Sequence, residues 1–329
     1  MIKKSTFLTA SLTLLALLGT AFPAGATSIG PYSGGVGNPN DPNPFDEPIP
    51  GFVGPDGDGR VTNNNYVNPA FVAWATGYLD YLPAPGVSAG FQTPERFLGP
   101  VTGDNFDIVS LGDLNQSQID AWLADPENNP GPGQITLTFE SGIGNGAGAD
   151  FAIFENGFFS NFTIPETGSV EGMLFGELAY VEVSSNGVDF ARFDSHALQD
   201  SPVGAYGSFD PTGYYNLAGK HANAYGQSWG TPFDLATLSS HSLVLDGRVD
   251  LNNIGYVRLI DIPGSGNFLD AYGNAIYDAW VTWGSGGADL EAIGVLNAAR
   301  SSAPVPEPAT LTLLAMGAAF LARRARSGN

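Results

Sequence analysis

Short runs in which apolar and polar residues alternate dominate the middle of the chain. In residues 134–139, Ile135, Leu137 and Phe139 alternate with polar side chains, which is typical of a half-buried strand. Similar runs predict further strands at residues 149–155, 178–184, 188–193, 242–246, 255–262, 276–283 and 289–296. Asn186-Gly187 separates two of these runs and predicts a tight hairpin turn. Short strands with irregular loops predict an all-β fold, an antiparallel β-sandwich of jelly-roll type.

Two short accessory helices are predicted beside the strands. The first would begin at Asn68-Pro69, an N-cap residue followed by proline. Its apolar residues would share one helical face: Phe71, Trp74, Ala75 and Tyr78. The second covers about residues 116–124, with Ile119, Trp122 and Leu123 on one side. We expect both helices to cover the ends of the β structure.

Apolar segments at both ends of the chain predict export. Residues 1–26 combine a lysine pair, an apolar stretch and the small residues Ala24-Gly25-Ala26, an order typical of a cleaved signal peptide. Near the other end, the apolar segment 309–322 is shorter than the roughly 20 residues that span a bilayer comfortably. Arginines follow it, as the positive-inside rule expects of a membrane anchor. We therefore predict an N-terminal signal helix and a C-terminal membrane helix.

The chain between these signals divides by composition. Residues 27–65 are dense in Gly, Pro, Asn and Asp and predict an irregular lead-in. Residues 66–297 carry the strand patterns and predict a single β-sandwich domain. Residues 298–305 form a short linker to residues 306–329, which hold the sorting signal and its apolar helix.

The charge of the chain narrows the choice of partners. The chain has 33 acidic and 12 basic residues, and five of the basic residues flank the terminal apolar segments, so the body carries about −25 charges. Such a charge repels phosphate backbones and excludes nucleic acid as a partner. The chain has no cysteine, which excludes disulfides, thiolate nucleophiles and thiolate metal sites.

The C-terminal residues resemble the PEP-CTERM sorting domain of Gram-negative bacteria. The resemblance covers Val305–Thr310, the apolar segment after it and the terminal arginines. Its motif residues are Pro306, Glu307, Pro308, Arg323, Arg324 and Arg326. The resemblance implies processing by an exosortase, a membrane-embedded transpeptidase or protease, after signal peptidase has removed the N-terminal signal. It also implies transient inner-membrane anchoring, a final place at the cell surface or outside the cell, and bacteria that make exopolysaccharide.

The body of the chain resembles a group of exported bacterial proteins without an established activity. The segments that carry this resemblance are 109–114, 148–158, 177–190, 217–226, 233–236 and 285–296. They are spread over most of residues 66–297, which again favours one domain.

Acidic residues at strand ends and in turns suggest a structural calcium site. Ca²⁺ takes six to eight oxygen ligands, which carboxylates and loop carbonyls supply. The candidate ligands are Asp150, Glu155, Asp261, Asp270, Asp278 and Asp289. The alternative is that these acids cap turns and keep the surface soluble. The loop 54–65 places two aspartates as an EF-hand does, but Gly54 and Asn65 replace its outer ligands, so an ordinary turn is the better interpretation.

Aromatic residues in the glycine-rich segment 201–232 suggest a ligand surface, because the faces of sugar rings stack on flat aromatic rings. The candidates are Tyr206, Tyr214, Tyr215, Tyr225 and Trp229. The alternative is that they pack in the core and in loops. Trp280 and Trp283 are three residues apart in a predicted strand, so one of them should be exposed.

The sequence contains no recognisable catalytic constellation and favours a non-enzymatic protein. Gly226–Gly230 matches G-x-S-x-G, but Thr231-Pro232 follows where a nucleophile elbow needs a helix. We expect an exosortase-processed protein of the cell surface or extracellular matrix, a structural or glycan-binding module stabilised by calcium. The alternative is a secreted polysaccharide hydrolase with a carboxylate pair drawn from Glu155, Glu171, Glu177 and Asp194.

Overall fold

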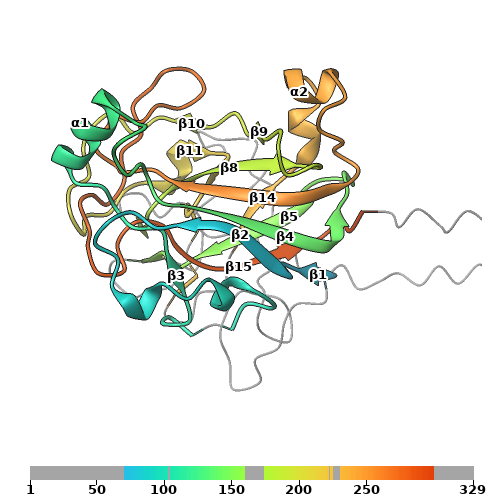
Figure 1. The fold of residues 1–329 in the computed structure, drawn as a ribbon, viewed down its shortest axis with the longest axis horizontal. Helices are drawn as coiled ribbons and strands as arrows, with labels where there is room; N and C mark the ends of the chain where they lie inside the picture. The colour runs from blue at the N-terminus through green and yellow to red at the C-terminus, as the bar shows by residue number, and fades with distance from the viewer. Residues whose placement is uncertain (1–69, 103, 160–173, 222, 225–229, 300–329) are drawn as a thin grey trace, which may run out of the picture.

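Two antiparallel sheets build the part of the chain that the computed structural model describes, residues 70–102, 104–159, 174–221, 223–224 and 230–299 (Figure 1). In the first sheet the strand order is β1 (Ala73–Trp74), β15 (Asp289–Val295), β5 (Phe151–Glu155) and β13 (Thr231–Phe233). β3 (Val109–Ser110) also pairs with β15. In the second sheet the order is β12 (Leu217–Ala218), β8 (Ala179–Ser184), β14 (Ile254–Asp261), β4 (Gln134–Ile143) and β2 (Gly77–Leu82). β9 (Ala191–Arg192) also pairs with β8.

Smaller elements join these sheets. β6 (Phe158–Phe159) pairs with β7 (Leu174–Phe175), and β10 (His196–Ala197) pairs with β11 (Tyr214–Tyr215). The α-helices are α1 (Gln116–Ala124) and α2 (Ser242–Leu245). Single 3₁₀ turns are η1 (Ala89–Phe91), η2 (Pro94–Phe97), η3 (Pro211–Gly213) and η4 (Leu235–Leu238).

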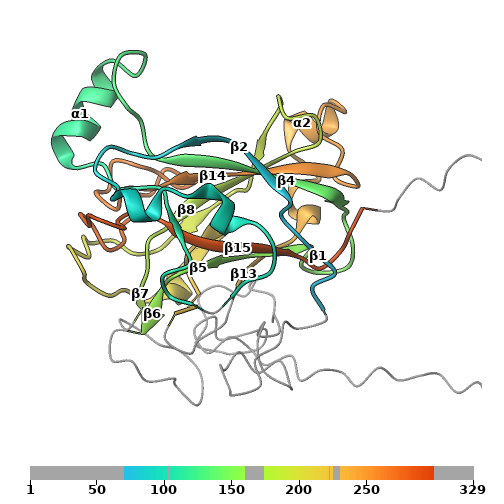
Figure 2. The same cartoon turned by 60° about the horizontal axis from the view of Figure 1, so that its bottom comes forward.

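The two sheets face each other across one apolar core. Figure 2 shows β2, β4 and β14 above β15 and β5. Inward residues of both sheets are buried in a single cluster: Ile135 and Leu137 of β4, Val181 and Val183 of β8, Ile153 of β5, and Ile293 of β15. Because strand side chains alternate between faces, the neighbours of these residues point outward. This arrangement confirms the predicted all-β fold with antiparallel sheets and few short helices.

The jelly-roll connectivity and the two terminal helices of the fold prediction are not tested by the described residues. The jelly-roll connectivity stays a prediction, because this strand order does not establish it. The signal helix and the C-terminal membrane helix lie outside the described residues. Within the described residues, none of the helices has the length and apolar character needed to cross a membrane.

Most of the predicted strands are confirmed, and two are wrong. β4, β5, β8, β14 and β15 form where the alternation predicts them, and of residues 188–193 only β9 forms. Residues 242–246 form the short helix α2, where the side chain of His241 accepts a hydrogen bond from the N–H of Leu243 (3.2 Å) and caps the first turn. Residues 276–283 form no strand, because their backbone groups pair with separate loops. The N–H of Ile276, for example, donates to the carbonyl of Phe268.

One of the two predicted helices is confirmed. α1 begins after Asn115, whose side chain accepts from the N–H of Gln118 while the Gln118 side chain accepts from the N–H of Asn115. The predicted helix at residues 68–78 is wrong in its described part, which forms β1 and β2. β1 pairs with β15 of the first sheet and β2 with β4 of the second, so the chain crosses between the sheets here. Apolar residues on both sides of the crossing produce the helix-like spacing.

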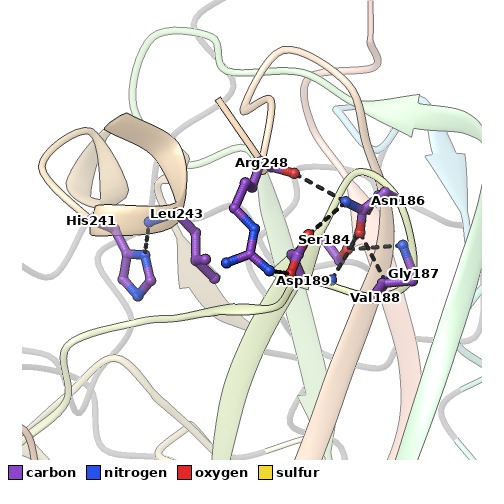
Figure 3. A network of polar contacts seen from close by, with 8 residues as sticks. All are labelled: Ser184, Asn186, Gly187, Val188, Asp189, His241, Leu243 and Arg248. Atoms are coloured by element: carbon purple, nitrogen blue, oxygen red, sulfur yellow. Dashed lines mark hydrogen bonds and ion pairs between the residues drawn. The ribbon is translucent and has the colours of Figure 1, made fainter. Parts of the chain in front are cut away.

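The predicted hairpin at Asn186-Gly187 is confirmed between β8 and β9 (Figure 3). The side-chain oxygen of Asn186 accepts from the N–H groups of Val188 and Asp189, both at 2.9 Å. Gly187 has φ of 73°, a conformation that glycine adopts at little cost. Asp189 forms an ion pair with Arg248, which joins the turn to the segment after α2.

Candidate functional site

Carboxyl groups close one end of the sandwich core. The inward row of β5 runs Phe151, Ile153 and then Glu155, and that of β14 runs Val257, Leu259 and then Asp261. In β8 the inward row begins at Ala179, and Glu177 precedes it by two residues. The register places Ala179 opposite Asp261, and Leu290 opposite Glu155. Each row therefore ends in an acid at the same end of the core.

Six acids gather at this end, and we call them the carboxyl cluster: Asp113, Glu155, Glu177, Asp261, Asp278 and Asp289. All but the half-buried Asp113 are almost fully buried, with exposed fractions between 1% and 6%. Contacts bring them together: the N–H of Asp289 donates to Glu155 (3.4 Å), and Thr282 contacts both Asp113 and Glu177. At such short range the charge of one acid raises the pKa of its neighbours.

Backbone N–H groups of the surrounding loops bind the cluster. The N–H of Gly157 donates to Glu155 (2.8 Å), that of Leu178 to Asp278 (2.7 Å), and that of Ala288 to Asp261 (2.8 Å). Hydrogen bonds to carboxylates are strong and compensate part of the cost of burial. The cluster therefore fixes the loops at this end of the sandwich.

Thr282 links two members of the cluster. Its hydroxyl donates to Glu177 and lies 3.0 Å from Asp113, and its N–H donates to Asp113 (2.9 Å). The N–H of Gly287 also donates to Glu177 (3.0 Å). Near them, the hydroxyl of Ser110 donates to Asp289. The segment 282–289 is thus held against β8 and β3 by its contacts with acids.

Burial gives these carboxyls unusual proton affinities. It raises the pKa of Asp289 to about 8, although hydrogen bonds from Ser110 and Ser285 act in the opposite direction. Burial likewise raises the pKa of Glu155 and of Glu177 well above the usual range, and the charge of Asp289 adds to both shifts. At neutral pH part of the cluster is therefore protonated.

The described arginines all pair with acids outside the cluster. Arg192 and Arg258 both bind Glu182 on the outer face of the second sheet, where the two side chains also stack over aromatic rings. Arg248 pairs with Asp189, and Arg96 lies 3.8 Å from Asp107. The described arginines therefore do not balance the buried carboxyls of the cluster, which accept hydrogen bonds from loop N–H groups and from the hydroxyls of Ser110 and Thr282.

A hollow of about 220 Å³ opens over the cluster, and we call it the aromatic hollow. Glu155, Glu177 and Asp289 line it together with Asn156 and Thr282. Its other walls are aromatic: Phe91, Phe106, Phe158, Phe175, Tyr206 and Trp283. Acids with raised pKa beside aromatic rings in a concave site are typical of ligand-binding and catalytic sites.

Three of these rings reach the surface. Phe106, Trp283 and Tyr206 are 69%, 66% and 55% exposed. Tyr206 stacks on Phe175 with ring centroids 6.2 Å apart and meets Trp283 edge-on at 5.6 Å. Exposed aromatic rings cost free energy in water, and a group of them beside a hollow is typical of a binding surface.

Two larger hollows lie elsewhere. One of about 870 Å³ runs along α1 and is lined by Trp122, Phe268, Tyr180 and Arg192 among others. The other, of about 1100 Å³, is lined mainly by small polar residues and glycines, such as Asn145, Gly146 and Asn252. Neither is lined by the carboxyl cluster, so the aromatic hollow is the better candidate site.

The predicted calcium ligands divide between the cluster and two other places. Glu155, Asp261, Asp278 and Asp289 belong to the cluster. Asp150 binds the N–H groups of Gly146 and Leu235 at the opposite end of β5, and Asp270 organises a turn with Asn274. Among the described residues, no three His, Cys, Asp or Glu side chains are placed to hold one metal ion. The calcium site stays a prediction.

The predicted aromatic surface differs from the observed one. Tyr214 is fully buried, packs edge-on against Phe209 and donates its hydroxyl hydrogen to the carbonyl of Tyr277, so it belongs to the interior. Tyr215 lies half-buried in β11. Tyr225, Trp229 and the sorting residues lie outside the described residues, as does Glu171 of the proposed hydrolase pair.

Sequence reasoning found part of the site. Trp283 is exposed and Trp280 is partly buried, with its ring N–H donating to the carbonyl of Leu114 (2.9 Å). Glu155 and Glu177, two of the candidates for a hydrolase pair, both line the aromatic hollow, whereas Asp194 does not. Phe106 and Asp113 were missed, because they lie in loops without a periodic pattern.

Comparison with known proteins identifies one segment. Residues 304–327 match the PEP-CTERM protein-sorting motif. The chain is therefore an exported cell-surface protein that is targeted to an exosortase. No curated protein matches the chain.

Proposed function

We propose that the body of this exported protein binds a polysaccharide, with one sugar residue in the aromatic hollow. The observation that carries the proposal is the exposed pair Tyr206 and Trp283 beside a hollow lined by carboxyl groups. Aromatic rings stack on the apolar faces of sugars, and carboxyl groups accept hydrogen bonds from hydroxyls. A volume of about 220 Å³ lies below that of pockets for drug-sized ligands and suits a single sugar residue.

Export supports a polysaccharide as the partner. The sorting motif directs the protein to the cell surface, where exopolysaccharide of the extracellular matrix is the expected carbohydrate. We further propose that the apolar segment 309–322 anchors the protein transiently in the inner membrane before exosortase processing. In this proposal the protein holds matrix polysaccharide at the cell surface and performs no chemistry on it.

Hydrolysis is the second candidate function, because Glu155 and Glu177 line the same hollow. The positions of these two carboxyls support hydrolysis less well than they support binding. Oε2 of Glu155 accepts from Gly157 at 2.8 Å, and Oε1 of Glu177 accepts from both Thr282 and Gly287. A carboxyl fixed by loop donors can accept a further hydrogen bond from a ligand, but it is poorly placed to protonate a glycosidic oxygen or to attack the sugar as a nucleophile.

Replacing an exposed ring tests the proposal. We expect the full chain to bind a hexasaccharide in isothermal titration calorimetry and Trp283→Ala to weaken that binding about 10-fold or more, as is typical of a central aromatic contact. Tyr272→Ala is the matched control, because Tyr272 is 71% exposed and does not line the hollow. Equal affinities of the wild type and Trp283→Ala would contradict the proposal.

The same samples separate binding from hydrolysis. A binding protein leaves the number of reducing ends constant over a long incubation. Release of reducing ends that Glu177→Gln abolishes would instead establish the hydrolase.

A further inference from the structure

The polar groups that line the aromatic hollow are mostly hydrogen-bond acceptors. The carboxyls of Glu155, Glu177 and Asp289 face it, and the described lining residues include no lysine, arginine or histidine. The hydroxyl of Thr282 already donates to Glu177. A ligand that carries hydrogen-bond donors therefore finds several acceptors in this hollow.

An unused acceptor in the wall supports this conclusion. The side-chain N–H of Asn156 donates to the carbonyl of Asn105 (2.9 Å), which orients the amide. Its side-chain oxygen, Oδ1, is buried and has no hydrogen-bond partner among the residues that the structure describes. A buried acceptor without a partner costs about 1 to 3 kcal/mol. Since Oδ1 has no contact with solvent, a ligand in the hollow reaches it only after the Asn156 side chain turns.

The aromatic walls favour a cation among the possible donors. The faces of aromatic rings carry negative partial charge and attract ammonium groups within about 6 Å, more strongly where water is excluded. Tyr206 lies between Phe175 and Trp283, so rings of different orientation meet at one side of the hollow. Proteins recognise ammonium groups with aromatic rings of this kind combined with carboxyl groups.

The negative charge of the body also favours a cationic ligand. The body carries about −25 charges, and the described arginines are paired elsewhere. A field of this sign concentrates cations at the surface and repels uronic acids and phosphates. Positively charged sugars are therefore the carbohydrates that this hollow can accept most favourably.

We propose that the aromatic hollow recognises the protonated amine of an amino sugar, as found in a polysaccharide from which N-acetyl groups have been removed. The ammonium group donates to the carboxyls of Glu155 and Glu177, while the sugar ring stacks on Trp283. This inference rests on the proposed polysaccharide binding and adds the chemical class of the sugar. An N-acetyl group would place a bulky neutral amide where the hollow offers carboxyls.

The experiment compares three hexasaccharides with the full chain at pH 6.5: hexaglucosamine, hexa-N-acetylglucosamine and cellohexaose. We expect hexaglucosamine to bind at least 10-fold more tightly than the other two in isothermal titration calorimetry. We also expect proton release on binding, visible as a dependence of the heat on the ionisation enthalpy of the buffer, because a bound cation favours ionised carboxyls.

Two variants test whether the preference for hexaglucosamine arises in the aromatic hollow. Trp283→Ala should lose affinity for hexaglucosamine, and Glu177→Gln should reduce the preference for the free amine while it retains hydrogen-bond acceptors. Hexalysine serves as a cation without a sugar and should bind the wild type more weakly than hexaglucosamine does, because it has no sugar ring to stack on Trp283.

Each remaining outcome overturns a defined part of the argument. Equal affinities for the three sugars would overturn the amine inference and leave polysaccharide binding intact. Absence of binding to all three would overturn both proposals. Hexaglucosamine binding that neither variant changes would reveal general attraction to an acidic surface and would overturn the assignment to this hollow.

Discussion

Replacing Asp289 with asparagine is expected to flatten the pH dependence of folding stability. Asp289 is 6% exposed, and burial raises its pKa to about 8, against 3.8 for an ordinary aspartate. Between these two values the folded protein holds a proton that the unfolded chain lacks. The stabilisation from this group is therefore complete below about pH 3.8 and is lost as the pH rises toward 8.

The size of the effect follows from this difference in bound protons. One proton bound only by the folded state changes the free energy of unfolding by about 1.4 kcal/mol per pH unit. Between pH 5 and pH 7, Asp289 alone should therefore lower the stability by about 2.7 kcal/mol. Asparagine has the shape of the protonated acid and its oxygen can still accept from Ser110, but it binds no proton.

Urea unfolding of the purified full chain at pH 5, 6 and 7 measures this slope, with tryptophan fluorescence as the signal. Asp246→Asn is the matched control: it removes the same charge at an exposed position at the end of α2. General charge repulsion affects the wild type and the control alike, so only Asp289→Asn should flatten the slope. The reasoning is refuted if Asp289→Asn loses as much stability between pH 5 and pH 7 as the wild type does.

Two further substitutions test the turns that support the fold. Asn186→Ala removes the acceptor for two turn N–H groups and should lower the free energy of unfolding in urea by about 1 kcal/mol, whereas Val188→Ala, at an 80% exposed position, should change little. Gly219→Ala would place a Cβ 2.1 Å from the carbonyl oxygen of Glu177 at a φ of 86°. We expect a larger drop in melting temperature than for Gly247→Ala, which shares the positive φ but has open space; equal drops would contradict the close contact.

Much of the sandwich could be predicted from the sequence, because the period-2 pattern records which face of each strand is buried. The error at residues 68–78 has a physical cause. Phe71 and Trp74 pack on the outer face of the first sheet, whereas Ala75 and Tyr78 pack against the core between the sheets. A segment that crosses from one sheet to the other presents apolar residues on both sides, and this spacing imitates a helical face.

The candidate site could be predicted only in part. Glu155 and Asp261 extend the inward rows of their strands, so the sequence indicates buried acids at strand ends. It does not indicate that both ends meet, because β5 and β14 belong to different sheets and their meeting depends on how the two sheets pack face to face. Tyr206 could be named only as one of several aromatic residues in the glycine-rich segment 201–232, and Phe106 lies in a loop, where no periodicity reports on long-range contacts.

The number of protons that the carboxyl cluster binds affects both the folding stability of the protein and its proposed binding of a cation. If all five almost fully buried acids took up a proton on folding, stability would fall by about 7 kcal/mol per pH unit. A domain with a typical stability of about 5 to 15 kcal/mol would then unfold within about one or two pH units. The N–H donors at Glu155, Asp261 and Asp278 oppose this by favouring the ionised form, although burial still raises the pKa of all three acids above the usual range. A cluster that is partly ionised at neutral pH attracts an ammonium group and can release a proton when it binds one, so the acids that fix the loops are also suited to recognise a cation.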